Sequence, residues 1–171
     1  MRDSLAILLG GNLGEIGFTV VTGVINGGGS LNARQLLLVN LLTDILPAMA
    51  IAVRPPPTIT AEMLLAEGPE ASLGAICAWI LGRATGTLRQ ANTVALVALV
   101  AVQLGQTLVV RGRTPLVMAC ALVSFVALAA VVQTPGLSQF FGASPLFRHG
   151  WMIAAGATTA ATAISLLLQQ W

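Results

Sequence analysis

The chain has 171 residues, of which 56% are apolar and only 8% are charged, against about 25% charged in an average soluble domain. Eight basic and six acidic side chains cannot cover the surface of a soluble fold of this length, so the composition excludes a soluble module and predicts lipid as the solvent. The net charge of +2 is too small to indicate a nucleic-acid partner, which excludes that class as well.

Apolar segments separated by short polar breaks predict an all-α fold, an integral membrane helical bundle of about six transmembrane helices. A spanning helix needs about 20 mostly apolar residues. None of the segments alternates with the period of two that a membrane barrel requires. The chain is therefore predicted to form a single membrane domain, 1–171, with helices at roughly 4–25, 34–53, 70–86, 91–110, 115–133 and 149–169.

The breaks between these segments have the chemistry of helix ends. Asn32, three residues before Gln35, predicts a capping box at the start of the second helix. The run 54–57 contains three consecutive prolines, which cannot continue the hydrogen-bond ladder. Thr114 followed by Pro115 is typical of an N-cap and a first helical position. The other expected breaks are a turn at 26–30 and a loop at 134–149.

The third segment, 70–86, is short for a membrane span. Its uninterrupted apolar run covers only residues 71–82, a length more typical of a re-entrant or interfacial piece. With six spans the eight arginines divide four against four, which gives no positive-inside signal. The topology after residue 70 therefore stays open at this point.

Two acidic residues lie well inside the apolar segments, each beside neutral oxygen-bearing side chains. Asn12 and Glu15 are three residues apart on the first helix, and Asn40, Thr43 and Asp44 share one face of the second. An ionised carboxylate in hydrocarbon costs a few kcal/mol even on lenient scales. A membrane protein keeps such a group where it faces a partner or an ion pathway.

Five oxygen-bearing side chains on two adjacent helices are the ligands that a hard cation prefers. Pro47 has no N–H, so in a regular α-helix the carbonyl of Thr43 loses its partner and becomes a further oxygen near these side chains. The alternative for each single Asn or Thr is a hydrogen bond between helices. Gln103, in the fourth segment, is by itself a packing or hydrogen-bonding residue, and the joint pattern of the other five favours an ion site.

At these residues the chain resembles P-type cation-transporting ATPases of the calcium-pump type. The segments that carry the resemblance to their fifth and sixth helices are Asn12-Leu-Gly-Glu15, Asn40-Leu-Leu-Thr43-Asp44-Ile-Leu-Pro47 and Arg54-Pro55-Pro56. The resemblance implies that Asn12, Glu15, Asn40, Thr43 and Asp44 coordinate a transported cation, Ca²⁺ or a similar ion. It also places Gln103 where calcium pumps have a further acidic ligand, so Gln103 is an additional candidate for the site.

The resemblance implies a hairpin like helices five and six over 4–53 and helices like seven to ten over 70–169, with the short third segment as helix seven. The chain contains no lysine, so the Asp-Lys-Thr-Gly phosphorylation motif of the family is absent and the chain alone is not expected to hydrolyse ATP. It is expected to need no cofactor itself, Mg-ATP being used only by the complete enzyme.

The partners implied are the lipid bilayer and the N-terminal portion of the pump, which holds helices one to four and the cytoplasmic domains. The implied location is the cell membrane, crossed several times. The alternatives are a stand-alone, non-enzymatic helical membrane protein and an inactive gene remnant.

Overall fold

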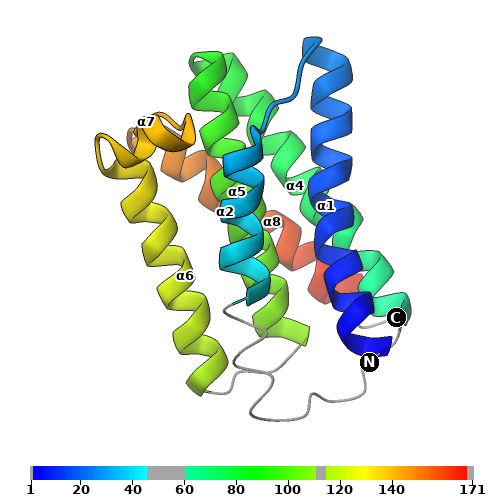
Figure 1. Cartoon of the computed structure of the whole chain (residues 1–171). Helices are drawn as coiled ribbons and strands as arrows, with labels where there is room; N and C mark the ends of the chain where they lie inside the picture. The colour runs from blue at the N-terminus through cyan, green and yellow to red at the C-terminus, as the bar shows by residue number, and fades with distance from the viewer. Residues whose placement is uncertain (1, 46–60, 111–114, 169–171) are drawn as a thin grey trace.

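The computed structural model describes residues 2–45, 61–110 and 115–168, and these residues form helices joined by short connections. The long helices run alternately in opposite directions (Figure 1), which confirms the predicted all-α bundle. They are α1 (Arg2–Asn26), α2 (Ala33–Asn40) with its π-helical continuation η1 (Leu41–Ile45), α4 (Ala61–Thr85), α5 (Leu88–Val110), α6 (Pro115–Gln133) and α8 (Arg148–Leu168). A short helix, α7 (Leu137–Phe141), precedes α8.

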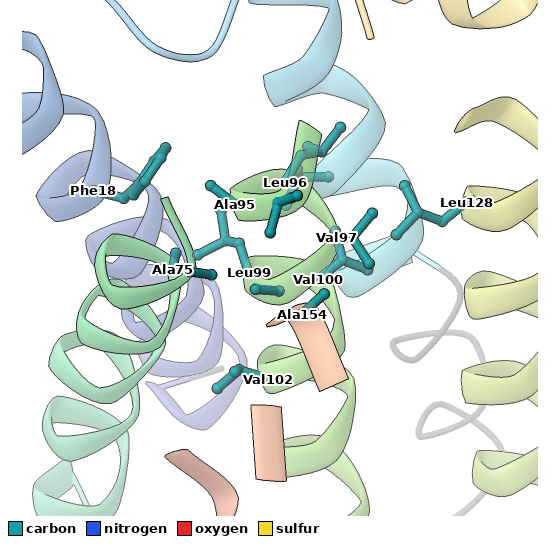
Figure 2. Close-up of a cluster of buried hydrophobic side chains, with 14 of the residues drawn as sticks. Phe18, Ala75, Ala95, Leu96, Val97, Leu99, Val100, Val102, Leu128 and Ala154 are labelled. Atoms are coloured by element: carbon teal, nitrogen blue, oxygen red, sulfur yellow. The ribbon is translucent and has the colours of Figure 1, made fainter. Parts of the chain in front are cut away.

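Helix α5 forms the centre of the bundle. Every residue from Val94 to Val100 is buried, with an exposed fraction of 2% or less. A helix that is apolar on all sides must be surrounded by other elements. Figure 2 shows the α5 side chains among residues of four neighbouring helices, Phe18 of α1, Ala75 of α4, Leu128 of α6 and Ala154 of α8.

Helices α1 and α4 approach each other closely because small residues separate them. The Oγ of Ser72 donates a hydrogen bond of 2.8 Å to the carbonyl of Gly14. A Cβ added at Gly17 would lie 2.6 Å from the same Oγ, so a larger residue there would displace the Ser72 hydroxyl from this bond. Glycine on the contact face allows this approach, as small residues do at helix interfaces in membranes.

The connection between α1 and α2 is fixed to α7. Asn32 caps α2 by accepting from the N–H of Gln35, whose side chain accepts from the N–H of Asn32 in return, so the predicted capping box is confirmed. The Nδ2 of Asn32 also donates to the carbonyl of Phe141 over 2.8 Å. Arg34 donates to the carbonyl of Phe140 over 2.8 Å, and its guanidinium lies 4.5 Å from the centroid of that ring. This end of the α1–α2 hairpin is thereby held to a distant part of the chain.

The third predicted segment is longer than its apolar run indicates. Helix α4 has 25 residues and begins at Ala61, with Pro69 inside it, so the expectation of a short helix at 70–86 is wrong. The additional residues are mostly Ala, Glu, Leu and Met, which are strong helix formers whether or not they are apolar. The predicted loop at 134–149 is also too long, because α7 occupies 137–141 and α8 begins at Arg148.

Some predictions fall on residues that the structure does not describe. These are the end of the second predicted helix after residue 45, the proline run 54–57, Pro47 and the cap at Thr114. The start of α6 at Pro115 agrees with the predicted boundary.

Two helices in the described part of the chain are long and apolar enough to cross a membrane, one over Leu88–Leu108 and one over Pro115–Gln133. The outer surface is also strongly apolar. Side chains such as Val24, Leu37, Leu122 and Met152 are more than 60% exposed. Large apolar side chains of this kind facing outward on several helices suit lipid rather than water.

Candidate cation site

The candidate site begins with a carboxylate buried between helices. Glu15 of α1 is only 4% exposed. Its carboxylate is hydrogen-bonded to the side chain of Gln103 on α5 and lies close enough to Asp44 of η1 for the two charges to interact. Three elements far apart in sequence thus bring their polar side chains to one place in the bundle interior.

The second helix loses its regular geometry at the residues that sequence analysis assigned to the site. It is α-helical up to Asn40 and π-helical over Leu41–Ile45. Single π turns inside helices are rare and are often found at functional sites. Thr43, which is 5% exposed, donates from its Oγ to the carbonyl of Val39 over 2.9 Å, and Asp44 is partly buried.

The carbonyl of Leu42, within the π turn, has a partner on another helix. The Oγ of Ser124 on α6 donates to it over 2.7 Å. Both Ser124 and Leu42 are buried, with exposed fractions of 0% and 3%. The π turn is therefore in contact with α1, α5 and α6 at once.

The Oδ1 of Asn40 is buried and has no hydrogen-bond donor among the described residues. A buried acceptor without a donor costs about 1–3 kcal/mol. A bound cation would remove that cost, because an amide oxygen is a good ligand for a hard ion. This oxygen is therefore a candidate ligand.

The donor set contains only oxygens that could bind an ion directly. The described residues hold no group of three or more His, Cys, Asp or Glu that could bind a metal. Two carboxylates with hydroxyl and amide oxygens suit a hard cation, whereas soft metals prefer thiolates and imidazoles. The side-chain oxygens thus have the chemistry that hard cations require.

The structure brings Glu15, Asp44 and Gln103 together and places Asn40 and Thr43 on the same turn as Asp44 or the turn before it. Asn12 lies one turn before Glu15 on α1 and is partly buried. Pro47 lies outside the described residues, and the irregular turn starts before it, at Leu41.

Sequence analysis missed one polar residue next to the site, Ser124. Its only signal in the sequence is that no other hydroxyl occurs in the segment 115–133. A second polar contact lies one turn further along α5, where the Nε2 of Gln106 donates to Glu70 of α4 over 3.1 Å. Glu70 is likewise not identified from the sequence, because it stands at the very start of the predicted segment 70–86.

A cavity of about 540 Å³ lies elsewhere, lined by residues that include Thr85, Gln90 and His149. These residues surround the turn between α4 and α5 and the start of α8. Gln103 lies three to four helical turns away along α5, so this cavity is separate from the candidate site.

Comparisons with known proteins show the family of the chain. The family model described as "Cation transporting ATPase, C-terminus" matches residues 30–171. The chain is 40% identical to the "Probable cation-transporting ATPase I" of Mycobacterium leprae over 207 aligned residues, which cover 100% of this chain and 13% of the relative. It is 39% identical to the protein of the same name from Mycobacterium tuberculosis over the same length and shares.

The chain thus spans about 13% of the length of the curated relatives that it matches. The alignments are longer than the 171-residue chain, so both relatives contain additional residues within the matched region. Since the family model covers most of the chain, this chain belongs to the cation-transporting ATPases and represents their C-terminal transmembrane region.

Proposed function

We propose that this chain forms the cation-binding part of a P-type pump of the calcium-pump type, in which Asn12, Glu15, Asn40, Thr43 and Asp44 bind the transported ion. The observation that carries the proposal is the burial of Glu15 between Gln103 and Asp44. Two carboxylates from different helices would repel each other in this low-dielectric environment. A cation between them would convert that repulsion into attraction.

The charge of the site indicates the class of ion. Glu15 and Asp44 together balance one divalent cation. Gln103 is neutral, and its side chain is already hydrogen-bonded to Glu15. Gln103 therefore adds no charge to the site, and it holds the Glu15 carboxylate in place. A site with two carboxylates rather than three favours the binding of a single Ca²⁺ or similar ion.

The remainder of the pump would supply what this chain does not contain. In the proposed complete protein the helices cross the cell membrane several times, and helices one to four complete the ion site. The domains that use Mg-ATP would drive the rearrangement of the helices. The chain itself has no lysine and hence no family phosphorylation motif, so it is proposed to act as the ion-coordinating part only.

Modification of carboxyl groups by dicyclohexylcarbodiimide, followed by mass spectrometry, tests the site directly. We expect Glu15 and Asp44 of the purified chain in lipid nanodiscs to react, and Ca²⁺ or Mn²⁺ to protect both from reaction. Choline chloride at equal ionic strength should not protect them. Glu70, a carboxylate bonded to Gln106 outside the site, is the internal control and should react equally with and without divalent cation.

Failure of both cations to protect Glu15 and Asp44 would remove the proposed function. Equal protection of Glu70 would show that the ions act on carboxylates in general. In either case a defined oligomer of the chain without ion binding would favour the stand-alone membrane protein.

A further inference from the structure

Helix α6 lies at the edge of the bundle and is almost wholly apolar. Leu116, Met118, Leu122 and Val126 are each 45% exposed or more. Ser124 is the exception on this helix, because it is polar and fully buried. Its environment thus differs from that of most of the helix that carries it.

A serine inside a membrane helix commonly bonds to a carbonyl of its own helix, three or four residues earlier. Ser124 instead donates to Leu42, which is 82 positions away in the sequence, over 2.7 Å. The bond therefore has a tertiary role, and it joins the outermost helix to the π turn of the candidate site.

The sequence explains why the carbonyl of Leu42 accepts a hydrogen bond from another helix. In a π-helix each carbonyl accepts from the N–H five residues later. Five residues after Leu42 is Pro47, which has no N–H. A proline at position 47 has no N–H to give to the carbonyl of Leu42 in a π register. The hydroxyl of Ser124 supplies a hydrogen bond to this carbonyl from another helix.

The register matters for the side chains that follow. A π turn contains more residues than an α turn, so a change of register rotates the residues within and after it relative to those before it. Thr43 and Asp44 lie within the π turn, directly after Leu42. The position of Asp44 close to Glu15 therefore depends on whether the π turn is maintained.

We propose that Ser124 is a positioning residue of the cation site, whose hydroxyl stabilises the π turn over Leu41–Ile45 and thereby keeps Asp44 close to Glu15. The inference rests on the proposed function, since it assigns Ser124 a role in the same site. Ser124 does not itself touch the ion. It acts through the carbonyl of Leu42.

Two substitutions of equal shape separate the hydroxyl from packing. Ser124→Thr keeps the donor, and Ser124→Val has the same branched form without it. We expect Ser124→Val to raise the divalent cation concentration for half-protection of Glu15 and Asp44 about ten-fold, the effect of one lost hydrogen bond at the site. Ser124→Thr should stay within about two-fold of the unsubstituted chain. Ser124→Ala gives the same comparison in a smaller side chain, should the branched residues disturb folding.

A matched control removes one interhelical hydrogen bond away from the site. The Nε1 of Trp79 on α4 donates to Asn92 on α5 over 2.8 Å. Trp79→Phe should lower thermal stability without changing half-protection. Hydrogen exchange of the amides in residues 41–45 provides the second readout, and it should be faster in Ser124→Val than in Ser124→Thr.

The outcomes are distinct. Equal half-protection in the Val and Thr variants overturns the positioning role, even where exchange shows that the bond is lost. Equal exchange in the two variants shows that the hydroxyl does not hold the turn, and this also overturns it. If divalent cations protect nothing in the unsubstituted chain, the proposed function and the positioning role fall together, and the exchange experiment alone reports on the bond.

Discussion

Helices α5 and α6 are both long and apolar enough to cross a membrane, yet 78% of the α5 segment is buried inside the bundle and only 28% of the α6 segment. The helix with more polar residues is the one at the centre. Thr93, Gln103, Gln106 and Thr107 all lie on α5 and are all buried. In lipid the interior of the bundle is where polar groups find partners, whereas the outer surface needs only to be apolar.

Hydropathy therefore identifies helices that can cross a membrane, but it does not show which of them packs inside the bundle. Apolarity is satisfied equally by lipid and by protein. The buried position of α5 is instead marked by its amides and hydroxyls, which lipid cannot satisfy. The same logic singles out Ser124 on α6, the buried hydroxyl of an otherwise lipid-facing helix.

Truncation of one leucine on each helix should give the largest difference. Leu99 of α5 is 0% exposed, and Leu122 of α6 is 64% exposed. We expect Leu99→Ala to destabilise the bundle by about 2–5 kcal/mol, because it leaves a cavity that its neighbours cannot fill. Leu122→Ala should change stability by less than about 0.5 kcal/mol. Unfolding in mixed micelles measures the free energy of unfolding of both variants. Equal losses would contradict the placement of α5 inside the bundle and of α6 at its outer surface.

Replacement of the two α5 glutamines should sharpen the comparison within one helix. Gln103→Leu removes the partner of Glu15, and we expect about ten-fold weaker protection of Glu15 and Asp44 by Ca²⁺. Gln106→Leu removes the bond to Glu70 one turn away and should leave that protection within about two-fold. The Ca²⁺ concentration that gives half-protection of Glu15 and Asp44 is measured for each variant. A larger effect of Gln106→Leu would indicate that the site lies nearer to α4.

A smaller effect than those of Leu99→Ala and Gln103→Leu is expected at the exposed end of α6. The Nε2 of Gln133 donates to the carbonyl of Leu146 over 3.0 Å, and Gln133 itself is exposed. Gln133→Ala should cost about 0.5–1 kcal/mol, since water or headgroups can replace part of the bond. Thermal unfolding in nanodiscs measures the loss. A value as large as that for Leu99→Ala would show that this end of α6 is more tightly integrated than its exposure indicates.

Much of the fold followed from patterns along the chain. The apolar segments predicted six long helices, and the pair Asn32 and Gln35 predicted the start of α2 correctly because a capping box is a local feature. The length of α4 could not be read from hydropathy, since its first residues form a helix through propensity rather than apolarity. The short α7 was likewise hidden in a segment rich in proline and glycine.

The candidate site was predictable as a set of residue types and not as an arrangement. The five side chains on α1 and the second helix were identified from their spacing and the family motif. The contact of Glu15 with Gln103 depends on how α5 packs, which no local pattern encodes. The π turn was also unforeseen, because the only local signal was Pro47, which predicts a free carbonyl at Thr43 and lies outside the described residues.

The attachment of the α1–α2 connection to α7 has a mechanical consequence. Asn32 and Arg34 fix the hairpin at one end of the bundle, and η1 lies at the opposite end of the second helix. The π turn is held to α6 by the bond from Ser124 to the carbonyl of Leu42. If that bond breaks, the helix stays attached beside Phe140 and Phe141, and a tilt about this end displaces Thr43 and Asp44 more than the residues near Ala33.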